Sequence, residues 1–378
     1  MTHHRYRLDT RILSVFFLVA MPFVAFGAFV VIGMARGALT EQVGADLEQR
    51  AFQTRTTVER YVGDLWVQLR LVSNYPDVRQ ALASPAKPIT PDENDRLSQA
   101  WATGDKTLND AVVGSIVSAR LREVVRVRPA IRLLQVVDSQ GRLVGSSSRG
   151  GRILNADTAW FKSISTDPIL EKPWLGEVYQ PPGSSLAVYD LAWPVLDAEG
   201  VFLGALRAVA DAGDLYGVLA PVRLGRSGHA QLIRASDGLV LASDDSARVL
   251  KSVMPGFAYL RAAMAERRGY WLLPQVAEKA ADGSERVLEA PRLVGYSAVE
   301  QLPNVQWLVT VEQDNEEALA PLARITRYLW LHFLGAFGTA ILLGLYFSYK
   351  IEKPVIDEDI HLHEEHLPKD ARVVDAEE

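Results

Sequence analysis

Two long apolar stretches, one near each end of the chain, do most to limit how this sequence can fold. Residues 12–35 (ILSVFFLVAMPFVAFGAFVVIGMA) contain no charged side chain, and residues 328–349 (YLWLHFLGAFGTAILLGLYFSY) contain one histidine and no charged residue. A helix of about 20 apolar residues crosses a bilayer, so both stretches are long enough to do so. Because a signal peptide has an apolar region of only about 7–15 residues, the first stretch indicates a retained anchor.

Basic residues near the two stretches favour a cytoplasmic location for both ends of the chain. Arg5, Arg7 and Arg11 precede the first stretch, and Lys350 and Lys353 follow the second. An excess of lysine and arginine marks the cytoplasmic side of a membrane protein. We therefore expect the large central region to lie outside the cytoplasm, between two membrane-spanning helices.

The composition excludes several classes of function. The chain has 378 residues, a formal net charge of -6 and no cysteine. Proteins that bind nucleic acids usually carry an excess of basic residues, so a mild negative net charge gives no indication of a nucleic-acid partner. The lack of cysteine excludes disulfides, thiol catalysis and thiolate metal sites. A chain of this length has room for two ordinary domains with cores of their own.

The region after the first stretch begins with a pattern typical of a long amphipathic helix. Its apolar residues recur at helical spacing, at Leu47, Ala51, Val58, Tyr61, Val62, Leu65, Leu69 and Val72. Three prolines between residues 85 and 91 interrupt this pattern. We expect a second helix over residues 92–127.

The pattern then changes to strands and turns, and it repeats. LLQVVDSQGRLVGSS reads as strand, turn and strand, and QLIRASDGLVLAS has the same form. Gly141 in the first copy aligns with Gly238 in the second, a period of about a hundred residues. Each copy is followed by further strands, in LAVYDLAWPVLDAEGVFLGALRAV and in RLVGYSAVEQLPNVQWLVTVEQ. The repeat predicts two related α+β units in series.

These segments, in this order, resemble the double Cache (dCache) sensor module of bacterial chemoreceptors, histidine kinases and diguanylate cyclases. The resemblance rests on the long first helix, VVDSQGRLVGSS, the Trp160-Phe161 pair and the strands of the second unit. It implies an α+β fold: two Cache (PAS-like) units with antiparallel sheets, in tandem on a long N-terminal helix and flanked by two transmembrane helices. It also implies a bacterial inner-membrane location with the large domain in the periplasm.

The resulting domain prediction covers the whole chain. Its segments are a cytoplasmic N-terminus (1–11), a first transmembrane helix (12–35), the long helix with the membrane-distal Cache unit (36–215), the membrane-proximal Cache unit (216–315), a connecting helix (316–327), a second transmembrane helix (328–349) and a short cytoplasmic tail (350–378).

The membrane-distal unit is rich in aromatic and charged residues, a combination typical of ligand pockets. We predict a small-molecule site made of Trp160, Tyr179, Tyr189, Arg207 and Asp211. The resemblance places Trp160 at the pocket-lining tryptophan of the family, although such aromatics also commonly pack a core. Strand alternation puts Tyr189 and its neighbour Asp190 on opposite faces, so only one of those two can face a pocket.

Two positions depart from the members of the family that bind amino acids. Where those carry an arginine and an aspartate, this chain has Thr158 and, by simple counting, Val209, with Asp211 close by. An α-amino acid ligand is therefore not supported, whereas a carboxylate, an amine or another small metabolite stays open. The outer region shows no catalytic motif, so we expect no enzyme activity and no cofactor, and we interpret His229 as an exposed loop histidine.

The tail IEKPVIDEDIHLHEEHLPKD contains His361, His363 and His366, which could form a metal site, a partner-docking peptide or a solvated tail. It occupies the place where related receptors begin an output domain. We therefore predict a homodimeric sensor that passes its signal through the second transmembrane helix to an unknown cytoplasmic or membrane partner. A periplasmic scaffold that binds other proteins and a metal-binding tail with an enzymatic role are the alternatives.

Overall fold

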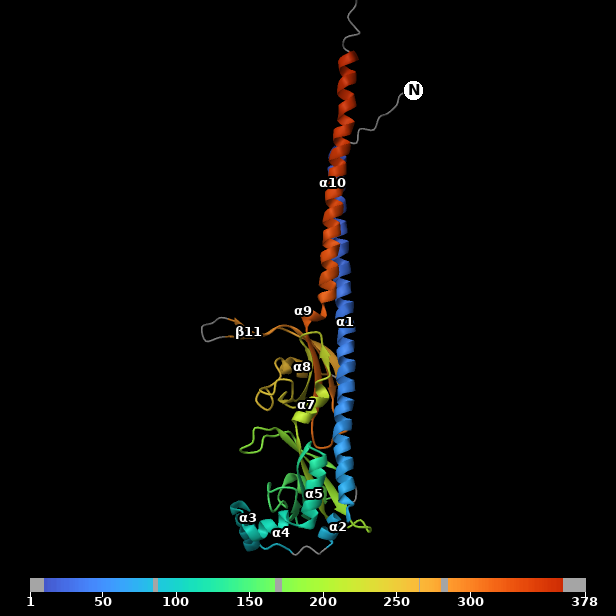
Figure 1. Ribbon diagram of the computed structural model, residues 1–378. Helices are drawn as coiled ribbons and strands as arrows, with labels where there is room; N and C mark the ends of the chain where they lie inside the picture. Colours follow the sequence, from blue (N-terminus) through green and yellow to red (C-terminus); the bar gives the residue numbers. More distant parts are fainter. Residues whose placement is uncertain (1–9, 84–87, 167–171, 265, 280–284, 363–378) are drawn as a thin grey trace, which may run out of the picture. The chain divides into compact units, whose positions relative to one another are not determined.

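The computed structural model describes residues 10–83, 88–166, 172–264, 266–279 and 285–362 (Figure 1). The chain divides into two compact units, one formed by Glu41–Ala318 and the other by the segments up to Thr40 and from Leu319 onward. The first unit combines helices with two antiparallel sheets. The predicted α+β class with paired antiparallel sheets is confirmed.

The second unit contains the apolar parts of two long helices, α1 (Thr10–Ser73) and α10 (Ala320–Leu362). Both are long and apolar enough to cross a membrane. Large apolar side chains along them are exposed, among them Phe23, Phe29 and Leu342. Such exposed apolar helices suit a lipid surrounding, which is consistent with a membrane location. The predicted tail is helical through Leu362, and its remaining residues, with His363 and His366, lie outside the described part of the chain.

The part of α1 within Glu41–Ala318 supports both sheets. Seven of the eight apolar residues predicted to face the core are buried in one cluster with strands of both sheets: Leu47, Ala51, Val58, Val62, Leu65, Leu69 and Val72. Tyr61 is partly buried against the same cluster. Burying a leucine or valine side chain contributes about 1.5–3 kcal/mol, so this stripe fixes α1 against the sheets.

Short helices follow α1, and they differ from the prediction of one helix over 92–127. They are α2 (Pro76–Leu82), α3 (Pro91–Thr103), α4 (Lys106–Val113) and α5 (Ile116–Val127). Gly104 ends α3 in the left-handed conformation, at φ 76°, which glycine adopts without a steric penalty. Asp105 and Ser115 then cap the starts of α4 and α5, accepting hydrogen bonds from backbone N–H groups. The prediction of one helix was wrong because the glycine ends one helix and the two capping residues each begin a new one, although the apolar residues continue at helical spacing.

The first sheet, here called the distal sheet, has the strand order β2-β1-β5-β4-β3. Its strands are β1 (Ile131–Asp138), β2 (Leu143–Ser146), β3 (Trp174–Leu175), β4 (Val188–Leu196) and β5 (Phe202–Asp211). Helix α6 (Ala159–Thr166) packs on β4 and β5, and α7 (Gly213–Leu219) follows β5.

The second sheet, here called the proximal sheet, has the order β6-β7-β13-β12-β9, with β8 paired to β7. Its strands are β6 (Arg223–Leu224), β7 (Gly228–Arg234), β8 (Val240–Ala242), β9 (Arg268–Leu273), β12 (Arg292–Ala298) and β13 (Trp307–Asp314). Helix α8 (Phe257–Ala263) lies between β8 and β9 in the chain, β10 (Val276–Lys279) and β11 (Glu285–Glu289) form a separate hairpin, and α9 (Asn315–Ala318) follows β13.

Each sheet turns one face to α1 and carries polar residues on the other. In the distal sheet, Leu134, Leu191 and Leu206 pack in the core cluster that contains α1. Val137 and Ala205 point the other way and pack with Trp160 and Phe161 of α6. Because side chains alternate along a strand, the polar residues that share the α6 face can meet one another.

Candidate functional site

Three polar residues from neighbouring strands meet on the α6 face of the distal sheet. Gln135 of β1 lies opposite Arg207 of β5 in the strand register. Asp190 of β4 lies opposite Val209, two residues along β5 from Arg207 and therefore on the same face. The sheet register thus brings an amide, a guanidinium and a carboxylate together.

Arg207 is the centre of a network of hydrogen bonds. Its Nε and Nη2 donate to Asp190 Oδ2 at 3.2 and 2.8 Å, and its Nη1 donates to Gln135 Oε1 at 3.0 Å. The hydroxyl of Tyr179 donates to Asp190 Oδ1 at 3.1 Å. The side chains of Arg207 and Asp190 are only 12% and 11% exposed. We call these four residues the distal cluster; it holds two opposite charges that compensate each other.

Aromatic and backbone groups cover the distal cluster. The Arg207 guanidinium lies 5.9 Å from the ring centroid of Trp160, which is buried in α6. Gly151 has φ 65°, and a Cβ there would lie 3.1 Å from the Gln135 amide and 3.2 Å from Arg207 Nη1. Trp101 donates from Nε1 to the Gly151 carbonyl at 3.1 Å, which fixes this loop. The glycine therefore lets the backbone close directly over the cluster.

The phenol of Tyr179 stays protonated across the ordinary pH range. Burial, together with the nearby charge of Asp190, raises the pKa of Tyr179 to about 12. A neutral phenol can donate a hydrogen bond to a carboxylate, as it does to Asp190. The site therefore offers one positive charge, one negative charge and two neutral polar groups.

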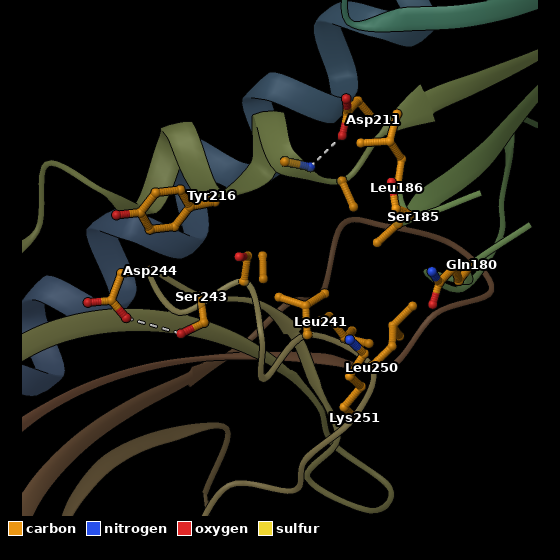
Figure 2. Close-up of a pocket in the computed structure, with 16 residues that line it drawn as sticks. Gln180, Ser185, Leu186, Asp211, Tyr216, Leu241, Ser243, Asp244, Leu250 and Lys251 are labelled. Atoms are coloured by element: carbon orange, nitrogen blue, oxygen red, sulfur yellow. Dashed lines mark hydrogen bonds between the residues drawn. The ribbon is translucent and has the colours of Figure 1, made fainter.

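The structure brings three of the five predicted ligand residues together and separates two. Trp160, Tyr179 and Arg207 belong to one site. Tyr189 lies on the opposite face of β4, fully buried, with its ring edge-on to Trp307 at 6.2 Å. Asp211 ends β5 and accepts a hydrogen bond from the Gly213 N–H at 2.8 Å, in the wall of a separate cavity (Figure 2).

Sequence reasoning missed two members of the cluster, Gln135 and Asp190. It noted Asp190 among the charged residues near the aromatic ones and as the neighbour that faces away from Tyr189, but it left Asp190 out of the predicted site. The signal that could have found Asp190 was the same alternation, once Arg207 had been chosen as a ligand residue. Nothing in the sequence fixed the register of β1 against β5, so Gln135 could not be placed beside Arg207.

The proximal sheet also carries a polar cluster on the face away from α1, and it changes the interpretation of His229. The imidazole is not exposed in a loop: its side chain is 17% exposed and its Nε2 lies 2.9 Å from Glu312 Oε1. Gln231 donates to the same Glu312 oxygen at 3.1 Å, and Arg292 Nη1 lies 3.3 Å from its Oε2. We call these four residues the proximal cluster. His229 was misread because its glycine-rich flank suggested a turn, whereas it belongs to β7.

The predicted metal site in the tail falls largely outside the described residues. His363 and His366 lie beyond Leu362, and of His361 only the helical backbone is described. Within the described ranges, no group of three or more histidine or acidic side chains could hold a metal ion.

Comparison with known proteins places the fold. The Cache domain family dCache_1 matches residues 35–322. No curated protein sequence matches the chain. Solved structures similar to it include the ligand-binding domain of the Pseudomonas aeruginosa amino acid chemoreceptor PctC, in complex with GABA, at 16% identity and TM-score 0.44, covering 72% of this chain and 100% of that one.

Two further solved structures are similar at the same level. The ligand-binding domain of the Pseudomonas fluorescens chemoreceptor CtaA with L-serine has 15% identity and TM-score 0.44, with 73% of this chain and 99% of that chain covered. A domain of a sensory box/GGDEF family protein from Vibrio parahaemolyticus has 15% identity and TM-score 0.47, with 74% and 99% covered. With the family match spanning both sheets and their supporting helix, the chain belongs to the Cache domain family of sensor domains.

Proposed function

We propose that this protein is a membrane-anchored extracytoplasmic sensor that binds a small molecule at the distal cluster and signals through α10 to a separate partner protein. The observation that carries the proposal is the Arg207–Asp190 pair beneath Trp160. A buried ion pair adds little net stability compared with apolar residues of the same volume. Its presence next to an aromatic wall therefore favours a role in recognition.

The pair also suggests the chemistry of the ligand. Arg207 can bind an acidic group through two parallel N–H donors, and Asp190 can bind a basic group. Either group competes with the internal pair, so ligand binding would open it. Because Thr158 and Val209 lack the charges that the resemblance associates with amino acids, we expect a different charged metabolite. The cluster contains no nucleophile beside a base, so we propose binding without catalysis.

Contacts between the two sheets support a route for the signal. Trp307, the first residue of β13, donates from Nε1 to Glu177 Oε2 at 3.0 Å and packs against Tyr189. Glu177 precedes Tyr179 by two residues, and Tyr189 is the neighbour of Asp190. A ligand that moves Tyr179 or Asp190 would therefore shift the neighbours of Trp307. From β13 the chain continues through α9 into α10.

The proposal includes a homodimer formed through α1. Val67 and Leu71 on α1 are 57% and 61% exposed, so this helix keeps apolar side chains that do not pack on the sheets. A second copy of α1 would cover them in a symmetric interface. Light scattering of the full chain in detergent should give the mass of two chains, and Leu71→Glu should lower that mass to one.

Thermal unfolding of the full chain in lipid nanodiscs, with a panel of charged metabolites, tests the sensor function. A ligand at about 100 times its Kd stabilises the folded state by about 2.7 kcal/mol, a rise in melting temperature of several degrees. We expect at least one compound to give this rise in the native chain and in Glu199→Gln, which changes an exposed turn. Asp190→Asn and Tyr179→Phe should reduce it. Equal stabilisation of all four proteins would contradict binding at the distal cluster.

Co-purification tests the partner. The intact chain and a version ending at Lys353 should be isolated from the same membranes and their bound proteins compared. A signalling partner should accompany the intact chain, and its dependence on the last residues would show whether the tail holds it. A ligand-dependent change in the amount bound would distinguish a sensor from a constitutive scaffold.

A further inference from the structure

The loop that follows β2 lies directly over the distal cluster, and we call residues 148–152 of this loop the lid. Both flanks of the lid are fixed to the β1–β2 hairpin. The N–H of Ser147 donates to the Leu134 carbonyl at 2.9 Å. The Ile153 carbonyl accepts from the Leu143 N–H at 2.8 Å. Both flanking residues are buried, whereas most of the lid is exposed, so the lid is a short segment with two fixed ends.

The inner side of the lid touches the distal cluster with backbone alone. Gln135, which is fully buried, donates from Nε2 to the Gly150 carbonyl at 2.9 Å, while its Oε1 accepts from Arg207. A Cβ on Gly151 would come within 3.2 Å of the Gln135 amide and of Arg207 Nη1. No side chain therefore separates the lid from these two groups, and Gln135 links the lid to the arginine at the centre of the cluster.

Arg149 fastens the lid to the end of α3. Its Nη2 donates to the Trp101 carbonyl at 2.7 Å and to the Ala102 carbonyl at 3.2 Å. These carbonyls belong to the last turn of α3, where the helix dipole favours a positive charge. Trp101 adds a neutral hydrogen bond, from its Nε1 to the Gly151 carbonyl at 3.1 Å. We call these three hydrogen bonds the latch.

An open hollow of about 510 Å³ adjoins the lid and is lined by Trp101, Ala102, Arg149, Gly150 and Gly151. The two glycines thus separate this hollow from the distal cluster. Other covers of the cluster are held more firmly. Trp160 packs with Phe161 in a buried core, and β1, β4 and β5 each pair with a strand on both sides. Moving the lid breaks only the latch and the bond from Gln135.

We propose that the lid is the gate of the distal cluster, and that Arg149 is a positioning residue that keeps the gate closed. The ligand enters from the hollow when the latch breaks, while both flanks of the lid stay fixed. A ligand group that draws Arg207 away from Gln135 also weakens the bond from Gln135 to the lid, so occupancy and lid position are linked. The inference rests on the proposed function, since the molecule that passes the lid is the proposed ligand.

Because the chain has no cysteine, a single introduced thiol reports the opening of the lid without any ligand. Gln135→Cys places the thiol directly beneath the lid. Its rate of reaction with N-ethylmaleimide, followed by mass spectrometry of the full chain in nanodiscs, measures local opening. Ala205→Cys is the probe for unfolding of the distal sheet, since Ala205 is fully buried on the same face but packs with Trp160 and Phe161. We expect Gln135→Cys to react about tenfold faster, or more, than Ala205→Cys.

Arg149→Ala, added to each probe, tests the latch. Loss of two hydrogen bonds from a charged donor should raise the reaction rate of Gln135→Cys about tenfold and leave that of Ala205→Cys unchanged. Arg152→Ala is the matched control, because it removes the same charge from the same lid. Arg152 pairs with Asp157 at 2.9 Å and takes no part in the latch, so both probes should keep their rates.

The proposal is overturned if Arg149→Ala leaves the rate of Gln135→Cys unchanged; access to the cluster would then lie elsewhere, on the side of Tyr179, which is 37% exposed. An equal rise with Arg152→Ala overturns the latch, and an equal rise at Ala205→Cys shows unfolding of the sheet in place of a gate. The outcomes stay distinct from those of the ligand screen. A lid that opens in a chain stabilised by no charged metabolite contradicts the sensor and keeps the gate, whereas a ligand found with an unresponsive lid does the reverse.

Discussion

The two sheets share one arrangement, in which one face packs on α1 and the other carries a polar cluster, but the two clusters differ in their residues. Each packs one face on α1 and carries, on the other face, a glutamine beside an arginine–carboxylate pair. In the distal sheet the pair is Arg207–Asp190, with a tyrosine hydroxyl and a tryptophan over it. In the proximal sheet it is Arg292–Glu312, and a histidine takes the place of the aromatic neighbours.

The two clusters differ in how exposed their charged side chains are. In the proximal cluster the carboxylate is 3% exposed and receives three side chains, so no ligand group has room to replace a partner. In the distal cluster both charged side chains keep some exposure, and a glycine loop closes over them. This difference supports the proposal that the distal cluster serves recognition, and it suits the proximal cluster to a structural role.

Removal of the proximal carboxylate should have the largest effect. Glu312→Gln removes the negative charge from a buried site. The imidazolium of His229 and the guanidinium of Arg292 then lose the carboxylate that compensates them. Breaking a buried ion pair in this way costs about 3–5 kcal/mol. Chemical denaturation of the full chain in nanodiscs, followed by tryptophan fluorescence, would measure the loss. A loss as small as that of the exposed variant Glu199→Gln would show that the proximal cluster is not structural.

The equivalent change in the distal sheet should cost less. Asp190→Asn keeps the shape of the side chain but weakens its bonds to Arg207 and Tyr179. Because the pair is about a tenth exposed, we expect a loss of about 1.5–3 kcal/mol, the range for hydrogen bonds to charged groups. The same denaturation experiment compares both variants. A larger loss at Asp190 than at Glu312 would reverse the assignment of the two clusters.

How far the sequence predicts this architecture differs between the elements and the sites. Helical spacing in α1 identified seven buried core residues. Apolar residues at positions i, i+3 and i+4 lie on one face of a helix, and that face packs on the core. The internal repeat predicted two units, because each hairpin carried its own turn residues. The break between α3 and α5 was missed, because Gly104 and Ser115 act through local capping that a periodic pattern does not reveal.

The sites needed the strand register as well. The family resemblance placed Trp160 in a candidate pocket, and the concentration of aromatic and charged residues placed Arg207 there. Strand alternation could not choose between Tyr189 and Asp190. The pairing of β4 with β5 shows that Asp190 shares a face with Arg207. The ring contact between Tyr189 and Trp307 of β13 shows that Tyr189 faces the other way. Such contacts join residues far apart in the chain, and no local pattern encodes them.

The pH dependence of stability should belong to the proximal cluster. The His229 Nδ1 lies 3.0 Å from the Ser227 carbonyl and its Nε2 lies beside Glu312, so both ring nitrogens face acceptors and the imidazolium form fits. The hydrogen bond to Glu312 raises the pKa of His229 despite its burial. Burial alone would raise the pKa of Glu312, yet His229 and Arg292 outweigh it and lower that pKa.

The sign of each effect follows from linkage. The raised pKa of His229 contributes stability that is complete below its unfolded value of about 6.5 and is lost as the pH rises through the folded value. The lowered pKa of Glu312 contributes stability that is complete above its ordinary value of 4.5 and is lost as the pH falls through the folded value. Melting temperature should therefore decline as the pH rises above about 6.5, and His229→Gln should flatten that decline. An identical pH profile in His229→Gln would contradict the effect.

The smallest effect concerns the contact that joins the two sheets. Trp307 and Glu177 form one hydrogen bond, at 3.0 Å, and Trp307 also packs edge-on to Tyr189. A double-mutant cycle of Trp307→Phe and Glu177→Ala isolates the hydrogen bond, whose coupling energy should be about 0.5–1.5 kcal/mol. A ligand at the distal cluster that alters Tyr179 should change this coupling energy, whereas one that only stabilises the distal sheet should not. Zero coupling with and without ligand would mean that the Trp307–Glu177 hydrogen bond does not carry the signal from the distal sheet to β13.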